Sequence, residues 1–257
     1  MGQITATMER TIKELVREKT VLFWTVAWPI LWVLIGAFSF VSGAPEDILP
    51  YMRGAVTVPM MVFALMIAGM SNLPASVASD RERGMLNKLM SMPVSPWRDF
   101  AGRILGLATF SVIAVAAVAA VGYSIGARFD FTASALAKAL GFLVLVFFAS
   151  TGVGTLIASL IKPVHGAIMT GVGISVITAA IGGMFTPYEY LPDFIQNFAK
   201  IYPVSIGNSA LKYILVGADY AGYNPLNATQ IGLAVSTTAI IVAAGVIIYS
   251  RYCWMRR

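Results

Sequence analysis

The chain has 257 residues, of which 58% are hydrophobic and 12% are charged, and its formal net charge is +6. A soluble domain carries about 25% charged residues, so this composition indicates a membrane protein, whose basic excess belongs in cytoplasmic loops rather than on nucleic acid. The single cysteine, Cys253, excludes an intrachain disulfide and a multi-cysteine metal site, and the single histidine, His165, excludes most histidine-based catalysis and zinc chemistry.

The first predicted element is an amphipathic helix over residues 4–19. Its apolar face carries Ile4, Met8, Ile12, Leu15 and Val16, and charged residues cover the other face. A short helix of this kind lies in the membrane interface rather than crossing the bilayer. Packing of the same face on a soluble partner is the alternative that the pattern leaves open.

Six apolar runs follow that are long enough to cross a bilayer, which takes roughly 20 residues. They are residues 21–41, 54–78, 104–127, 136–161, 166–186 and 229–250. None has a charged residue in its central part, which argues against proton relays and ion-coupled transport. Pro29, Pro59 and Pro74 fall in or beside the first two runs, where we expect them to kink the helices. The sequence therefore predicts an all-α, polytopic fold in which residues 1–257 form a single transmembrane domain.

The charged residues between these spans predict the orientation of the chain. With the N-terminus inside, the inner segments hold 13 basic and 6 acidic residues, whereas the outer segments hold 5 basic and 6 acidic residues. The positive-inside rule then places both termini in the cytoplasm. We expect a multi-pass protein of the plasma (inner) membrane of a prokaryote.

A charged segment separates the second span from the third, on the predicted inner side. Its charges alternate in sign from Asp80 to Arg83, and apolar residues then recur at helical spacing until Pro93. This pattern predicts a short amphipathic helix within residues 80–97 that a soluble partner grips. An ordinary solvated loop is the alternative. The candidate docking residues are Asp80, Arg81, Glu82, Arg83, Gly84, Met85, Leu86, Leu89, Met92 and Pro93.

The longest predicted outer segment, residues 187–228, carries two more helical patterns. One starts near Pro192 and the other near Pro203, and both are too short to span. We expect them to enter the outer leaflet and return, as a re-entrant hairpin before the last span. No G-x-x-x-x-G-K-[ST] phosphate loop occurs, so the chain is not expected to bind nucleotide or to be an enzyme on its own.

The order and sidedness of these elements resemble the membrane subunit of an ABC transporter of the type-2 exporter (ABC-2) family, in its drug-resistance and nodulation-like branch. The motifs that carry the resemblance are Asp80-Arg-Glu-Arg-Gly84, Met92-Pro-Val-Ser95 and Tyr202-Pro-Val204, and it covers essentially the whole chain. Met85 departs from the pattern, because relatives usually carry a threonine after the glycine.

The resemblance implies a complex in which the chain pairs with a second copy of itself or a paralogous permease. Two separate ATPase subunits would bind beneath and hold the ATP and Mg²⁺, and residues 83–92 would be the coupling helix. The outer helices would act as a gate, for which the candidates are Leu191, Phe194, Phe198, Tyr202 and Pro203. The second and fifth spans would line the substrate pathway, for which the candidates are Phe63, Met66, Met70, Asn72, Met184, Phe185 and Tyr188.

The pathway candidates suit an amphipathic, drug-like or lipid-like substrate, although a methionine and aromatic stripe is also typical of packing or of lipid contact. A polysaccharide or glycolipid exporter of the same family is an alternative function. A secondary transporter that works without ATP is another, and it predicts charges within the spans or an inverted repeat, neither of which the sequence shows. A membrane-embedded enzyme would need a clustered set of catalytic side chains.

Overall fold

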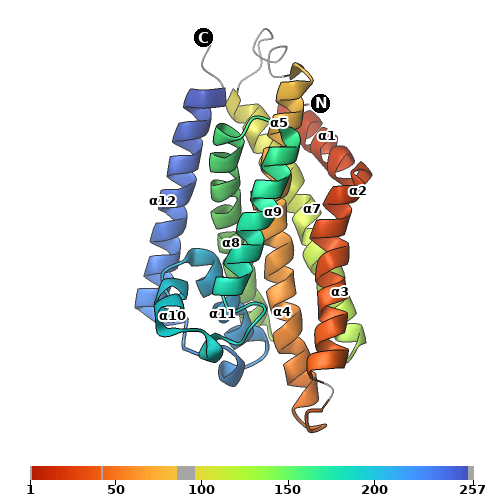
Figure 1. The fold of residues 1–257 in the computed structure, drawn as a ribbon, viewed down its shortest axis with the longest axis vertical. Helices are drawn as coiled ribbons and strands as arrows, with labels where there is room; N and C mark the ends of the chain where they lie inside the picture. The colour runs from red at the N-terminus through yellow and green to blue at the C-terminus, as the bar shows by residue number, and fades with distance from the viewer. Residues whose placement is uncertain (1, 42, 86–95, 254–257) are drawn as a thin grey trace.

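The computed structural model describes residues 2–41, 43–85 and 96–253, and every regular element in these ranges is a helix. The α-helices form an elongated bundle (Figure 1). They are α1 (Gln3–Arg17), α2 (Lys19–Leu22), α3 (Trp28–Ile35), α4 (Leu49–Ile67), α5 (Leu73–Glu82), α7 (Pro96–Ser124), α8 (Ala133–Leu160), α9 (Val164–Ile181), α10 (Asp193–Ala199), α11 (Pro203–Leu215) and α12 (Ala228–Cys253). Both termini lie at one end of the bundle, the termini end, and α10 and α11 lie at the other, the α10–α11 end.

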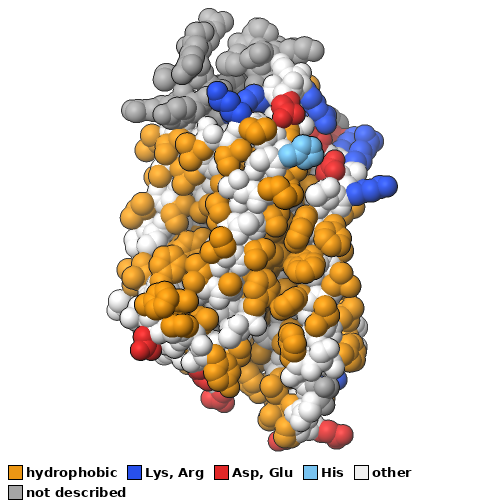
Figure 2. Space-filling model, viewed as in Figure 1, with side chains coloured by type: hydrophobic (Ala, Val, Ile, Leu, Met, Phe, Trp, Pro, Cys, Tyr) orange, Lys and Arg blue, Asp and Glu red, His pale blue; other side chains and the backbone are white. Residues whose placement is uncertain are grey.

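Within the described residues, six helical stretches are long and apolar enough to cross a membrane, which confirms the six predicted spans. They are Lys19–Phe40, Leu49–Glu82, Trp97–Ser124, Ala133–Leu160, Val164–Ile181 and Ala228–Tyr249. Figure 2 shows an apolar surface over the middle of the bundle, with the charged side chains gathered at its two ends. This distribution is the one expected of a protein surrounded by lipid.

The second span is longer at both ends than the predicted run 54–78. It continues for 34 residues, which at 1.5 Å per residue is about 50 Å and exceeds a hydrocarbon core of about 30 Å. The apolar run marks only the part that avoids water, whereas the helical hydrogen bonds continue into polar residues. The second span also lies at the centre of the bundle. Within its most apolar 18 residues 89% are buried, whereas the figure for the last span is 17%.

Two of the three span prolines follow π-helical segments. The segment η1 (Phe23–Ala27) precedes Pro29, and η3 (Ala68–Asn72) precedes Pro74. Proline has no N–H to donate to the carbonyl of residue i−4, and its ring clashes with that carbonyl. A wider, π-helical turn before the proline relieves this clash. The two wide turns are joined by one hydrogen bond, in which Asn72 Nδ2 donates to Thr25 Oγ1 at 2.9 Å.

The N-terminal helix α1 packs along α7. The two glycines of Gly102-x-x-x-Gly106 make this possible, since a Cβ at either position would overlap the backbone or threonine side chains of α1. Thr11 and Leu15 of α1 are buried. One face of α1 is therefore occupied by the bundle itself, and its predicted place in the membrane interface stays a prediction.

Two short helices occupy the predicted outer segment. The helix α11 is buried against α8 and α4, whereas α10 exposes Phe194 and Phe198. Their depth in a membrane stays a prediction, but α11 fills one end of the bundle and shapes the pocket described below.

Candidate functional site

A buried cluster of charges lies at the termini end, and we call Thr7, Arg10, Asp80, Asp99 and Arg103 the charged cluster. The side chain of Arg103 has no exposed surface, and its Nη2 donates to Asp80 Oδ2 at 2.6 Å and to Asp99 Oδ2 at 3.3 Å. Buried charges are stable only when they are paired and hydrogen-bonded. Arg103 on α7 and Asp80 on α5 therefore hold these two helices in one arrangement.

The helix α1 completes the cluster from the other side. Arg10 Nη2 donates to Asp80 Oδ2 at 2.5 Å, and Thr7 Oγ1 donates to Asp99 Oδ1 at 3.2 Å. Asp80 thus accepts from two arginines, one on each neighbouring helix. The cluster ties the three helices α1, α5 and α7 together with two positive and two negative groups.

The next two residues of α5 contact the turn between α8 and α9. Arg81 Nη2 donates to the carbonyl of Ala158, in the last turn of α8, at 3.1 Å. Glu82 Oε1 accepts from the N–H of Val164, the first residue of α9, at 3.0 Å. A cation at a helix C-terminus and an anion at an N-terminus are both favourable, because they complement the helix dipoles. The end of α5 is therefore bound to four other helices.

The predicted docking residues at the end of α5 differ in their exposure. Asp80 is 3% exposed and lies behind any docking surface, whereas Glu82 and Arg83 are exposed. Gly84 takes a left-handed φ of +67° just after α5, and this turn redirects the chain. The predicted docking residues Leu86, Leu89, Met92 and Pro93 lie outside the described residues. Sequence reasoning missed the partners of Asp80, although the i,i+4 spacing of Asp99 and Arg103 was a signal for an ion pair on one helix.

Four of the pathway candidates lie inside the subunit. Phe63, Met66 and Met70 are fully buried, Asn72 bonds to Thr25, and Ser175 Oγ donates to the sulfur of Met70 at 3.6 Å. In this arrangement they pack the second span against its neighbours. Their contact with a substrate stays a prediction.

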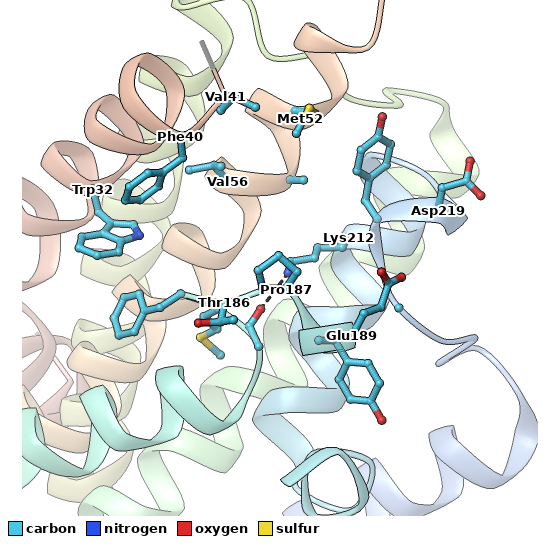
Figure 3. A pocket seen from close by; sticks show the side chains of 17 residues that line it. Trp32, Phe40, Val41, Met52, Val56, Thr186, Pro187, Glu189, Lys212 and Asp219 are labelled. Carbon is cyan, nitrogen blue, oxygen red and sulfur yellow. Dashed lines mark hydrogen bonds between the residues drawn. The ribbon is translucent and has the colours of Figure 1, made fainter. Parts of the chain in front are cut away.

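The other three, Met184, Phe185 and Tyr188, line a pocket at the α10–α11 end, which we call the aromatic pocket (Figure 3). Its volume is about 300 Å³, and its walls come from α3, the first turns of α4, the loop after α9 and α11. The Phe185 ring lies 4.9 Å from the ring of Trp32. Lys212 of α11 points into the middle of this pocket, where its Nζ donates to the carbonyl of Gly183 at 2.9 Å. Burial lowers the pKa of Lys212 to about 8.

The gate candidates lie beside the aromatic pocket. Gln196 Nε2 donates to the carbonyl of Leu191 at 2.8 Å, and the ring of Phe198 stacks on that of Tyr202 at 5.6 Å. Pro203 starts α11, and Phe194 is 74% exposed. Their gating role stays a prediction. Among the described residues, no group of three histidine, cysteine, aspartate or glutamate side chains is placed to hold a metal ion.

Comparisons with known proteins agree with this architecture. The family model described as "ABC-2 type transporter" matches residues 2–216. Two curated relatives, each named "Probable multidrug ABC transporter permease YbhR", come from Escherichia coli K12 and Escherichia coli O157:H7. Each is 32% identical over 133 residues, which are 50% of this chain and 34% of the relative. The chain thus spans about a third of the length of these relatives.

The family match includes the charged cluster, the central second span and Lys212. It includes five of the six candidate spans, and the sixth begins at Ala228, after the end of the match. The chain therefore belongs to the ABC-2 type transporter family.

Proposed function

We propose that the chain is the transmembrane subunit of an ATP-driven exporter. It forms the substrate pathway as a dimer, with a second copy or a paralogous permease, and is driven by two ATPase subunits that carry the ATP and Mg²⁺. The observation that supports this most directly is the course of the second span. This span is the most buried one in the bundle. It stays helical through α5 as far as Glu82, which lies within the charged segment of residues 80–97.

The contacts at the end of α5 suit the transmission of a force. Arg10, Asp80 and Arg103 join α5 to α1 and α7, and Arg81 and Glu82 join it to the turn between α8 and α9. A displacement of residues 83–92 by an ATPase would therefore act on five helices together. An ordinary solvated loop would not need buried ion pairs at its base.

The proposed orientation places the termini end, and with it the charged cluster, in the cytoplasm. On the face shown in Figure 2, most of the visible lysine and arginine side chains lie at this end. The basic excess of the segments at this end supports the same assignment under the positive-inside rule. An ATPase beneath would then meet α1 and the segment after Arg83.

For the substrate we propose an amphipathic, drug-like or lipid-like molecule, which agrees with the name that the two E. coli relatives carry. The alternatives are a polysaccharide or glycolipid, and transport without ATP. The apolar second span, without a charge between Gly54 and Ala78, favours an apolar pathway over an ion-coupled one.

The test is ATP-driven export from vesicles that contain the chain and its copurified ATPase. Leu89→Ala is expected to lower transport and substrate-stimulated ATP hydrolysis, because it shortens the predicted docking face. Leu160→Ala is the matched control, since Leu160 is 71% exposed at the termini end of α8. Equal activity of the two variants would overturn the coupling, and transport by the chain alone in an ion gradient would overturn the dependence on ATP.

A further inference from the structure

The aromatic pocket combines apolar walls with one buried cation. Trp32 lies on one side of the pocket, Met52 and Phe185 also line it, and Lys212 lies in the middle with 7% of its surface exposed. A volume of about 300 Å³ lies at the lower limit of small-molecule sites, which are mostly apolar with a few placed polar groups. The pocket therefore has the composition of a binding site.

The charge of Lys212 is not balanced within the described structure. Its ammonium group has three N–H donors, and one of them is directed to Gly183 O. No carboxylate of the described residues lies within 4.0 Å of Nζ, although Glu189 and Asp219 line the other side of the pocket. Burial of a charge without a counter-charge is costly. An anion in the pocket would provide the missing acceptors.

Capping of α9 is the simpler structural role for Lys212, because Gly183 follows the end of that helix. However, Asn208, one turn earlier on α11, already donates its Nδ2 to the carbonyl of Gly182 at 3.2 Å. A neutral amide thus performs this task beside Lys212. The hydrogen bond to Gly183 uses one of the three N–H donors of Lys212, and this bond does not need the positive charge of the side chain.

We propose that the aromatic pocket binds the acidic head group, a carboxylate or a phosphate, of an amphipathic ligand. The head accepts from Lys212 Nζ, and the apolar part packs against Trp32 and Phe185. This inference rests on the proposed export function and names the chemistry of a ligand for it. The site is at the α10–α11 end and is separate from the four buried pathway candidates of the second span.

The test compares two probes that differ only in their head group, 12-bromododecanoate and 12-bromododecanol. Bromine quenches tryptophan fluorescence on contact, so quenching of the full chain in uncharged dodecyl maltoside micelles reports binding beside Trp32, and Trp32→Phe identifies the signal. At pH 7 we expect the acid to quench at about tenfold lower concentration than the alcohol, because hydrogen bonds to a charged group are the stronger ones. Lys212→Met is expected to abolish this preference and Lys212→Arg to keep it.

Equal quenching by the two probes in the wild-type chain would overturn the proposal, even if Lys212→Met does not fold. An unchanged preference in a folded Lys212→Met protein would overturn it as well. A brominated lysophosphatidate distinguishes the two head groups: tighter binding than 12-bromododecanoate identifies a phosphate head group, and weaker binding identifies a carboxylate head group. Because no ATPase is present, failure of binding is distinct from failure of the export function.

Discussion

Replacement of Arg103 by methionine should reveal how much the charged cluster stabilises the chain. Methionine keeps most of the buried volume but leaves two carboxylates, on Asp80 and Asp99, without their shared cation. Removal of one partner of a buried ion pair costs about 3–5 kcal/mol. Asp80 keeps Arg10, and Asp99 keeps the hydroxyl of Thr7, so we expect the lower value. About 3 kcal/mol corresponds to more than a hundredfold in the folding equilibrium.

Unfolding in mixed dodecyl maltoside and sodium dodecyl sulfate micelles measures this loss. Arg98→Met is the matched control, since Arg98 lies on the same helix, five residues closer to its start, and is exposed. Adding Asp80→Asn to Arg103→Met should recover part of the loss, because one uncompensated charge is removed. If Arg103→Met is as stable as Arg98→Met, the cluster does not hold α1, α5 and α7 together.

Three further predictions concern other parts of the bundle. Gly154→Ala should destabilise the chain by more than about 1 kcal/mol, because a Cβ there overlaps the carbonyl of Gly69. Gly141→Ala is the control on the same helix, with open space around it, and it should be neutral or stabilising in the same micelle titration. Asn72→Leu should cost about 1 kcal/mol, since it removes the hydrogen bond between the two π-helical segments, and an unchanged unfolding midpoint would contradict this. Because the pKa of Lys212 is lowered to about 8, raising the pH from 7 to 9.5 should remove the preference for the acidic probe, while the Lys212→Arg protein should keep it, since arginine stays protonated throughout.

The spans could be predicted from the sequence because their signal is local. Twenty apolar residues in a row give the same helix whatever their neighbours are, so all six spans were found. Their ends were less accurate. The helices continue past the apolar runs into Trp97 and Glu82, since backbone hydrogen bonding does not stop where hydropathy falls.

The site was harder to predict because its contacts join residues far apart in the chain. Arg10 and Asp80 are 70 residues apart, and Lys212 meets Gly183 across 29 residues. A charge pattern shows that an ion pair can form, but not whether its partner is in the same chain. The alternating charges before Gly84 suggested an external partner, and for Asp80 the structure provides two internal ones.

Because these charges are used within the chain, fewer groups of residues 80–97 are left for the proposed ATPase partner to recognise. Asp80 is buried, and Arg81 and Glu82 already bond to the ends of α8 and α9. A partner that competed for these groups would have to break buried or helix-capping contacts, which would cost more than an exposed ion pair returns. Beyond Met85, the predicted apolar stripe that ends at Met92 lies outside the described residues. Specific recognition by an ATPase should therefore depend on that stripe, with the charged cluster serving to pass its displacement to α1, α5 and α7.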